Sequence, residues 1–334
     1  MRLVTNAIVI LVCSLCAQFT FAAPSFNDVY PTTPDPFMGE YVGRWSAEEE
    51  VNPDIAAMVY PIGGGEYHIR LVTKLDVRCP IILDIDLKPK KGKLEFEEGA
   101  LRGETDGRTF TGARNKRTFT MQKVERVSPT EGRSAPEGAT ILFDGKGLDA
   151  WQSTEGWEVT PDGALMVTPK GKNLFSVGKW TDFEMHVEFR LPIMAASRGQ
   201  SRGNSGVFSQ GLYEVQVLDS FGLNGVFDEC GALYKLAAPH VNACYPPLRW
   251  QTYDILYTAP QYGPDGKLAA NGRITVRHNG VLIHNDQELL YITDWTEGDR
   301  LKPAPSEPGP IKIQAHNNFM QYRNIWLVDR APAK

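Results

Sequence analysis

The sequence predicts an all-β protein in which a small antiparallel β-domain precedes a larger two-sheet β-sandwich. The chain has 334 residues, which fits two domains at roughly 150 residues each. Its 31 glycines and 23 prolines together exceed the roughly 12% of an average protein, and this excess is typical of turn-rich chains. Apolar residues recur in short alternating runs, and no stretch keeps a helical period long enough for a substantial helix.

Composition and charge exclude several classes of protein. Hydrophobic residues make up 42% of the chain and charged residues 22%, which is ordinary for a globular protein and unlike a disordered chain, a coiled coil or a collagen. The formal net charge is -5. Because phosphate backbones bind to concentrated basic surfaces, we expect no nucleic-acid partner.

Residues 1–23 have the pattern of a secretory signal peptide. A positive start is followed by an apolar run that ends in small residues near Ala22, where cleavage is expected. The alternative is a retained membrane anchor, but Asn6, Gln18 and Thr20 interrupt the run. The pattern therefore predicts export to the periplasm or the extracellular space. No other stretch approaches the roughly 18 apolar residues of a membrane span.

The remaining chain divides into four segments. Residues 24–38 are Pro-rich and are expected to form an extended arm. Residues 39–127 contain short β-branched or alternating runs separated by turns such as GGG, which predicts a small antiparallel β-domain. Residues 128–139 combine Pro, Gly, Ser and charge without apolar periodicity, as a linker does. Residues 140–330 form the second unit.

The second unit has the strand pattern of a β-sandwich or jelly roll. About a dozen candidate strands occupy roughly 190 residues. Residues 183–191 (FEMHVEFRL) alternate between apolar and polar side chains, which predicts a strand with one buried face. Residues 273–284 (RITVRHNGVLIH) predict a hairpin, because Asn279 and Gly280 suit the positive φ angles of a two-residue turn.

Three cysteines follow the leader: Cys79, Cys230 and Cys244. An exported chain can form disulfides, and Cys230 and Cys244 lie 14 positions apart across a Gly/Pro-rich stretch. We predict that these two pair and that Cys79 is a buried free thiol; three reduced thiols are the alternative. The spacing does not provide the clustered ligands of a zinc site.

The second unit resembles the bacterial 3-keto-disaccharide hydrolase family, long known as a domain of unknown function. The resemblance covers about residues 140–330. The stretches that carry it are LFDGKGLDAWQ (142–152), FEMHVEFRL (183–191), GNSGVFSQGLYEVQVLDSFG (203–222), CGALYKLAAPHVNACYPPLRWQTYDI (230–255), RITVRHNGVLIHND (273–286) and FMQYRNIWL (319–327). It implies a concanavalin-A-like jelly roll and, as substrate, a glycoside or saccharide already oxidised at carbon 3.

That substrate defines the groups a site needs. A ketone at C3 acidifies the hydrogen at C2, so a base can remove this proton while the aglycone leaves from C1; water then adds to the enone. The site requires a base near C2, a donor or metal ion for the enolate oxygen, and an acid for the leaving group. Direct hydrolysis of the keto-glycoside is the alternative route.

Glu214 is the first candidate for catalysis. The period of two in YEVQV (213–217) places Glu214 and Gln216 on the face opposite the apolar side chains, where jelly rolls of this kind hold saccharides. We expect Glu214 to be catalytic, Gln216 to bind substrate, and Asp219, at the strand end, to be a further catalytic candidate. The alternative is ordinary solvated surface.

Two further motifs supply candidates. Arg202, Asn204 and Ser205 lie in a Gly-rich turn (SRGNSG), which either binds sugar or only needs glycine for its φ angles. In IKIQAHNN (311–318) His316 falls on the polar face, and an imidazole suits acid–base catalysis near neutral pH; a structural histidine is the alternative. His278 and His284 are expected to be structural.

Lys235, Trp250 and Gln251 are expected on the same face as Glu214. Lys235 is a candidate for stabilising the enolate, and Trp250 and Gln251 for binding the sugar ring; core packing is the alternative for Trp250. Arg323 is a candidate for binding hydroxyls, or it forms a surface salt bridge. A divalent cation such as calcium is compatible with acidic loops of this kind, but no ligand is assigned.

Two other functions compete with the keto-glycoside enzyme. The first is a non-catalytic, lectin-like carbohydrate-binding protein of the same fold, because fold does not determine function. The second is an ordinary glucanase, which would carry an acid at the centre of an E-x-D-x-x-E run. Gln216 stands at that position, so this alternative is discounted. The sequence does not define the oligomeric state.

Overall fold

The structure is a computed structural model that describes residues 24–46, 53–293 and 304–331. The predicted signal peptide lies outside the described residues. The N-terminal arm, which was expected to be extended, begins with one helical turn, α1 (Phe26–Val29). Asp28 stabilises this turn by accepting a hydrogen bond from the Ser25 backbone N–H at 2.8 Å. Within the described ranges, none of the helices has the length and apolar character needed to cross a bilayer.

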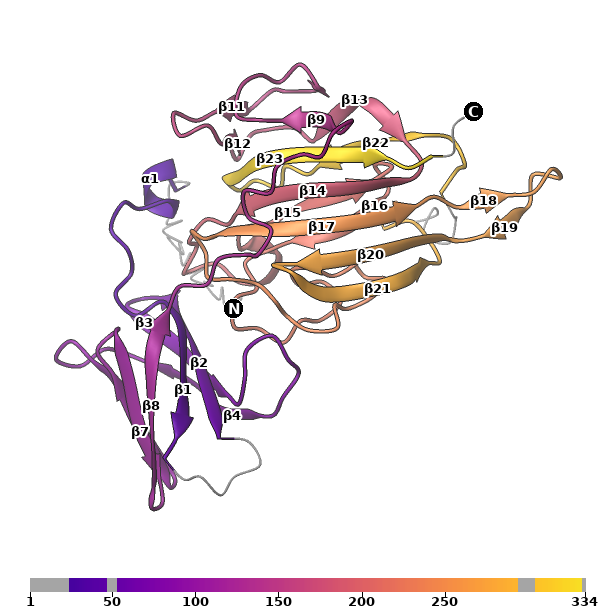
Figure 1. Ribbon diagram of the computed structural model, residues 1–334. Helices are drawn as coiled ribbons and strands as arrows, with labels where there is room; N and C mark the ends of the chain where they lie inside the picture. The colour runs from indigo at the N-terminus through magenta and orange to yellow at the C-terminus, as the bar shows by residue number, and fades with distance from the viewer. Residues whose placement is uncertain (1–23, 47–52, 294–303, 332–334) are drawn as a thin grey trace, which may run out of the picture.

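Residues 39–124 form one antiparallel sheet, here called the N-terminal sheet (Figure 1). Its strand order is β4-β3-β2-β1-β8-β7-β6-β5, so the first and last strands of the segment pair at its centre. The strands are β1 (Gly39–Trp45), β2 (Asp54–Gly63), β3 (Glu66–Val72), β4 (Ile81–Leu87), β5 (Leu94–Glu98), β6 (Leu101–Thr105), β7 (Thr109–Arg114) and β8 (Arg117–Val124).

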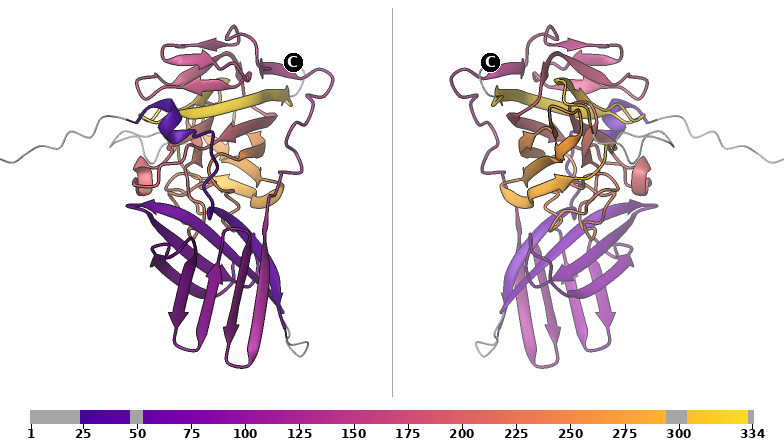
Figure 2. Two further views of the ribbon diagram at one scale, coloured as in Figure 1. Left: turned by 90° about the vertical axis from the view of Figure 1, so that its left-hand side faces the viewer. Right: turned by 90° about the vertical axis from the view of Figure 1, so that its right-hand side faces the viewer.

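Alternation along these strands builds a separate hydrophobic core. In β8, Phe119 and Met121 are buried, while the alternating Thr118 and Thr120 are exposed. Phe110 of β7 packs edge-on against Tyr41 of β1 at 5.8 Å between ring centroids. This apolar cluster lies inside the N-terminal sheet, which Figure 2 shows beneath the rest of the molecule.

Residues 140–329 form the sandwich. One layer, the five-stranded sheet, has the order β10-β13-β22-β15-β16; the other, the large sandwich sheet, has the order β11-β12-β23-β14-β17-β20-β21, with β9 pairing with β23. The strands are β9 (Thr140–Phe143), β10 (Trp151–Gln152), β11 (Trp157–Val159), β12 (Leu165–Val167), β13 (Leu174–Trp180), β14 (Phe183–Arg190), β15 (Ser205–Ser209), β16 (Tyr213–Val217), β17 (Trp250–Thr258), β20 (Gly272–His278), β21 (Val281–Leu289), β22 (Gly309–Ile313) and β23 (Met320–Asp329), with a separate hairpin of β18 (Gln261–Tyr262) and β19 (Leu268–Ala270) and the 3-10 turn η1 (Gly199–Ser201). The predicted all-β class is confirmed.

The local patterns explain this pairing. The apolar residues of β14, from Phe183 to Phe189, are buried between the sheets. The hairpin of β20 and β21 turns at Asn279 and Gly280, whose φ angles are 51° and 79°, as the type I′ turn requires. The main hydrophobic core lies between the two sandwich sheets.

The N-terminal sheet packs directly on the sandwich. Tyr60 of β2 is buried and contacts Phe221 of the sandwich, with 6.0 Å between ring centroids. Arg70 donates to Asn224 Oδ1 at 2.9 Å. Arg78, in the loop after β3, donates to the backbone oxygens of four sandwich residues, His240, Asn224, Gly225 and Pro239. The two units therefore share an interface of apolar and polar contacts.

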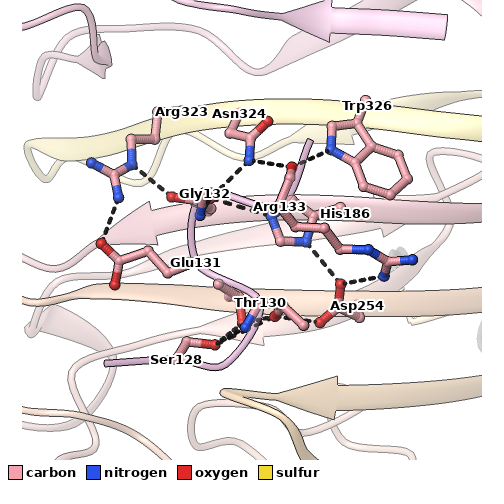
Figure 3. Close-up of polar contacts among 12 residues, drawn as sticks. Ser128, Thr130, Glu131, Gly132, Arg133, His186, Asp254, Arg323, Asn324 and Trp326 are labelled. Atoms are coloured by element: carbon pink, nitrogen blue, oxygen red, sulfur yellow. Dashed lines mark hydrogen bonds and ion pairs between the residues drawn. The ribbon is translucent and has the colours of Figure 1, made fainter. Parts of the chain in front are cut away.

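Residues 128–133, within the predicted linker, form a strap across the outer face of the large sandwich sheet (Figure 3). Thr130 donates to Asp254 Oδ2 at 2.7 Å, and the Gly132 N–H donates to Glu188 Oε1 at 2.6 Å. The strap covers His186, whose ring stacks on Trp326 at 5.3 Å. This cover explains why His186 and Glu188, on the polar side of β14, are also buried.

The predicted Cys230–Cys244 disulfide is not present: both cysteines, and Cys79, are free thiols. Cys230 and Cys244 are buried in the sandwich core, with Cys230 Sγ 3.2 Å from the Tyr253 hydroxyl. The two thiols are neighbours in the core. Burial and the neighbouring Cys230 thiol raise the pKa of the Cys244 thiol. Cys79 is only half-buried, contrary to the expectation that it is buried.

Candidate functional site

The outer face of the five-stranded sheet carries polar side chains that are nearly inaccessible to solvent. On β16, Val215 and Val217 point into the core, while Glu214 and Gln216 project from the opposite face. Glu214 is 4% exposed and Gln216 1%. Burial of an acid and an amide on the side away from the apolar core is costly without a compensating role, which makes this face the candidate site.

Lys312 joins this face from a neighbouring strand, and the sequence-based candidates did not include it. Phe208 of β15 pairs in register with Glu214 on one side and with Lys312 of β22 on the other. Lys312 is 3% exposed, and its Nζ lies 3.5 Å from the centroid of the Phe208 ring. The signal was present in IKIQAHNN, where Lys312 alternates with buried isoleucines just as His316 was argued to do.

A cluster of three amides borders Glu214. Asn204 Nδ2 donates to the backbone oxygen of Gln200 at 2.8 Å, and Gln216 Nε2 donates to Gln200 Oε1 at 3.2 Å. These bonds use the amide nitrogens of Asn204 and Gln216. Their oxygens, Asn204 Oδ1 and Gln216 Oε1, are buried and have no hydrogen-bond partner among the described residues. Buried acceptors of this kind are rare in native structures, so they are available to a ligand that brings O–H or N–H donors.

His316 and Lys235 lie in exposed segments near this face. His316 follows the end of β22 by three positions, and two residues further on Asn318 accepts a hydrogen bond from the Asn204 N–H at 2.7 Å. Lys235 is exposed in the loop beside β16, where the Tyr234 N–H donates to the Glu214 carbonyl oxygen at 3.3 Å. Both are thus placed on the side of the sandwich that carries Glu214.

Asp219 and Arg202 form a buried ion pair with each other, with Arg202 Nε 2.6 Å from Asp219 Oδ2. Burial raises the pKa of Asp219, and the positive charge of Arg202 opposes that rise. The Arg202 guanidinium also lies 5.1 Å from the Tyr60 ring of the N-terminal sheet. The pair therefore joins the turn before β15 to the end of β16 at the interface between the two units.

Ser205 and Gln251 point between the sandwich sheets. Ser205 Oγ donates to the Gln314 backbone oxygen and accepts from Tyr322, at 2.5 Å in each case. Gln251 Oε1 accepts from the Tyr245 N–H at 2.8 Å and lies 2.9 Å from His278 Nε2. The prediction that Gln251 lines the same face as Glu214 is wrong, because alternation along β17 turns it into the core.

Trp250 and Arg323 lie on the outer face of the large sandwich sheet, so the predicted place of Trp250 beside Glu214 is also wrong. Arg323 Nε donates to Glu188 Oε2 at 2.6 Å, and its Nη2 donates to Glu131 of the strap at 2.7 Å (Figure 3). The same guanidinium lies 4.1 Å from the Trp250 ring. Strand pairing explains these positions. Trp250 of β17 lies opposite Arg190 of β14 in the sheet, and Arg323 of β23 lies opposite Glu188 of β14.

The described residues contain no group of three or more His, Cys, Asp or Glu side chains arranged to hold a metal ion. His278 and His284 are buried, and burial lowers their pKa values to about 3 and about 4. Both are therefore neutral imidazoles at physiological pH. His284 Nε2 lies 2.7 Å from the Gly231 oxygen, a local structural contact.

Comparison with known proteins identifies the relatives of this chain. A model of the 3-keto-alpha-glucoside-1,2-lyase-like domain matches residues 138–328. A candidate glycosyl hydrolase from Parabacteroides distasonis ATCC 8503 shares 39% identity and a TM-score of 0.54, over 59% of this chain and 85% of that one. Two other candidate glycosyl hydrolases from the same organism share 17% and 21% identity with TM-scores of 0.43 and 0.41, over 61% and 57% of this chain and 98% of each of theirs. The comparison with curated proteins found no match.

The sandwich fold, the family model and the relative that is 39% identical define the class: the chain is a carbohydrate hydrolase-like protein. More specifically, it belongs to the family of 3-keto-alpha-glucoside-1,2-lyase-like domains, because the family model spans more than half of its residues. The predicted family and the jelly-roll sandwich preceded by a β-domain are confirmed.

Proposed function

We propose that the protein cleaves 3-keto-glycosides by removing the C2 proton, expelling the aglycone from C1 and adding water to the resulting enone. The observation that carries the proposal is the buried polar face on which Glu214 and Lys312 flank Phe208, beside two amide oxygens that have no partner in the described part of the chain. A sugar has the hydroxyl donors that those oxygens lack. The family supports the substrate class.

Glu214 is the proposed base. Its carboxylate takes the proton from C2, and the electrons of the broken C2–H bond become the enolate of the C3 ketone. The Lys312 ammonium is the proposed stabiliser of that enolate oxygen, since a cation in a water-poor site acts strongly on developing charge. The enolate then expels the aglycone from C1, which forms the C1=C2 bond.

His316 is the proposed proton donor for the departing oxygen, because its exposed segment also supplies Asn318 to the amide cluster. Gln216 and Asn204 are proposed to orient the sugar through its hydroxyl groups. Water then adds across C1=C2, with hydroxyl on C1 and hydrogen on C2, so the net reaction is hydrolysis. The leader further supports the proposal that the protein is exported.

The test is to incubate the purified protein with a 3-keto-disaccharide and, separately, with the unoxidised disaccharide. Cleavage of the keto form alone is expected. In D₂O, elimination and hydration place one deuterium at C2 of the product, whereas direct hydrolysis places none; product incubated without enzyme gives the background of spontaneous exchange. Binding of the keto sugar without turnover would instead favour the lectin-like alternative.

A matched pair of variants tests the base. Glu214→Gln keeps the size of the side chain but removes the carboxylate, and turnover is expected to fall by about 10²–10⁴-fold, the usual contribution of general base catalysis. Glu97→Gln, on an exposed position of the N-terminal sheet, is the control and should retain full activity. Full activity of Glu214→Gln would refute the assignment.

A further inference from the structure

A second candidate site lies between the N-terminal sheet and the sandwich. A cavity of about 910 Å³ is lined there by α1, by parts of β1 and β8, by residues 158–162, by residues 246–249 and by the start of β23. Glu214 and Lys312 do not line it. Its size is at the upper end for small-molecule sites, and nothing in the proposed reaction uses it.

The arginine charges in its wall are paired within the protein. Three arginines that line the cavity each meet a carboxylate that also lines it, so an ionic ligand would have to compete with a bound counter-charge. A neutral ligand that carries hydrogen-bond donors and acceptors binds without separating these ion pairs. The pairs are Arg126 with Glu40, Arg190 with Asp162 at 3.2 Å, and Arg249 with Glu125 at 2.5 Å.

Gln321 supplies an unused donor to the same wall. The side chain is fully buried, and its Oε1 accepts a hydrogen bond from Arg190 Nε at 2.5 Å. Because this bond defines which end of the amide is the oxygen, Nε2 is the other end, and no described residue accepts a hydrogen bond from it. A buried N–H without an acceptor is unfavourable, and a ligand oxygen would satisfy it.

Aromatic rings complete the wall. Phe26 stacks on Tyr30 at 5.0 Å and meets Phe319 edge-on at 6.0 Å between centroids. Phe26 and Phe319 are only half-buried, so apolar ring surface remains available for a ligand. Rings beside hydrogen-bonding groups match a pyranose, which has an apolar C–H face and a rim of hydroxyls.

We propose that this cavity binds a short neutral oligosaccharide, as a saccharide site separate from Glu214. The two sites are neighbours through one segment, since Asn318 bonds to Asn204 while Phe319 lines the cavity. The proposal concerns binding alone and does not depend on turnover, so it stands or fails separately from the proposed reaction.

Isothermal titration calorimetry with cellotriose, maltotriose and laminaritriose tests it, with trigalacturonate as the anionic probe. Gln321→Glu keeps the acceptor for Arg190, removes the unused donor and adds a negative charge; Gln261→Glu, at an exposed position of the β18–β19 hairpin, is the control for the same chemical change. Phe26→Ala removes one ring from the wall, and Phe227→Ala, an exposed phenylalanine elsewhere, is its control. Thermal melts establish that each variant is folded.

At least one neutral trisaccharide is expected to bind more tightly than trigalacturonate. Gln321→Glu and Phe26→Ala should each weaken that binding by about 5-fold or more, as the loss of one hydrogen bond or one ring contact does, while Gln261→Glu and Phe227→Ala leave it unchanged. Absence of binding, tighter binding of trigalacturonate, or unchanged affinity in both cavity variants would overturn the proposal.

Discussion

The carboxylate of Glu214 occupies the space that a side chain at Gly206 would need. A Cβ built on Gly206 would collide with Glu214 Oε1 and come within 2.8 Å of the Phe208 ring. Gly206 lies in a strand and has no positive φ angle. Glycine is therefore needed at this position for the space it leaves and not for its backbone conformation. The Gly-rich turn of the sequence thus makes room for the candidate base.

Gly206→Ala is expected to displace the Glu214 carboxylate and to lower kcat/KM on a 3-keto-disaccharide by about 10–100-fold, because small misplacements of catalytic groups are costly. The atoms that the new methyl group meets belong to the buried side chains of Glu214 and Phe208, so the melting temperature should also fall, as it does when a packed site is overfilled. Gly147→Ala, whose new methyl would meet only Asp149 at ordinary distance, is the control. Full activity of Gly206→Ala would contradict the assigned position of the base.

Lys312→Met tests the enolate stabiliser. The variant keeps a long side chain over Phe208 but removes the ammonium, and kcat is expected to fall by about 10²–10³-fold, as when a stabilising donor is deleted. Lys179→Met, at an exposed position on β13 of the same sheet, is the matched control. An equal, small effect in both variants would show that Lys312 has a structural role only.

The lowered pKa of Glu188 predicts how the free energy of unfolding depends on pH. Burial alone would raise its pKa, but hydrogen bonds from His186, Asn324, Arg323 and Gly132 lower it to about 2 from an ordinary 4.5. A carboxylate with a lowered pKa stabilises the fold above about pH 4.5, and this stabilisation is lost as the pH falls toward 2. Glu188→Gln should therefore lower the free energy of unfolding most above pH 4.5, and the difference from the wild type should narrow toward pH 2.

The pKa of His186 predicts how the free energy of unfolding changes at higher pH. Burial lowers its pKa, but the hydrogen bonds and charges of Asp254 and Glu188 outweigh burial and raise it above the ordinary 6.5. The stabilisation that protonated His186 contributes is complete below pH 6.5. It is lost as the pH rises through the pKa of His186 in the folded protein. Urea unfolding between pH 2.5 and 8 measures the contributions of Glu188 and His186 to the free energy of unfolding. The wild type is compared with Glu188→Gln and with the control Glu184→Gln, at a half-exposed position. A difference between wild type and Glu188→Gln that does not change with pH would contradict the lowered pKa of Glu188.

Tyr60 predicts how strongly the N-terminal sheet depends on the sandwich. Its ring is buried against Phe221 and the Arg202 guanidinium, so Tyr60→Ala is expected to lower the free energy of unfolding by about 3 kcal/mol, as for other buried aromatic rings. Tyr60→Phe keeps the ring and should cost much less. Denaturant titration measures both, and equal effects of the two substitutions would exclude packing as the cause.

Residues close in sequence were the best predicted. Alternation in β14 and β16 determines which side chains face the core, and Asn279-Gly280 determines the hairpin, because each depends only on local backbone geometry. The same local argument placed Glu214 and Gln216 on one face. It did not select Lys312, since nothing local distinguishes a lysine that packs over Phe208 from one in solvent.

What the sequence by itself determined is the all-β class, the family of the second unit and the face of each strand, because short-range periodicity and motifs encode these. Only the tertiary structure decided which strands are neighbours. That pairing placed Trp250 and Arg323 on the outer face of the large sandwich sheet and away from Glu214, turned Asp219 and Arg202 into a buried pair, and formed the cavity beside Gln321. Such relations depend on contacts between residues far apart in the chain, which periodicity does not specify.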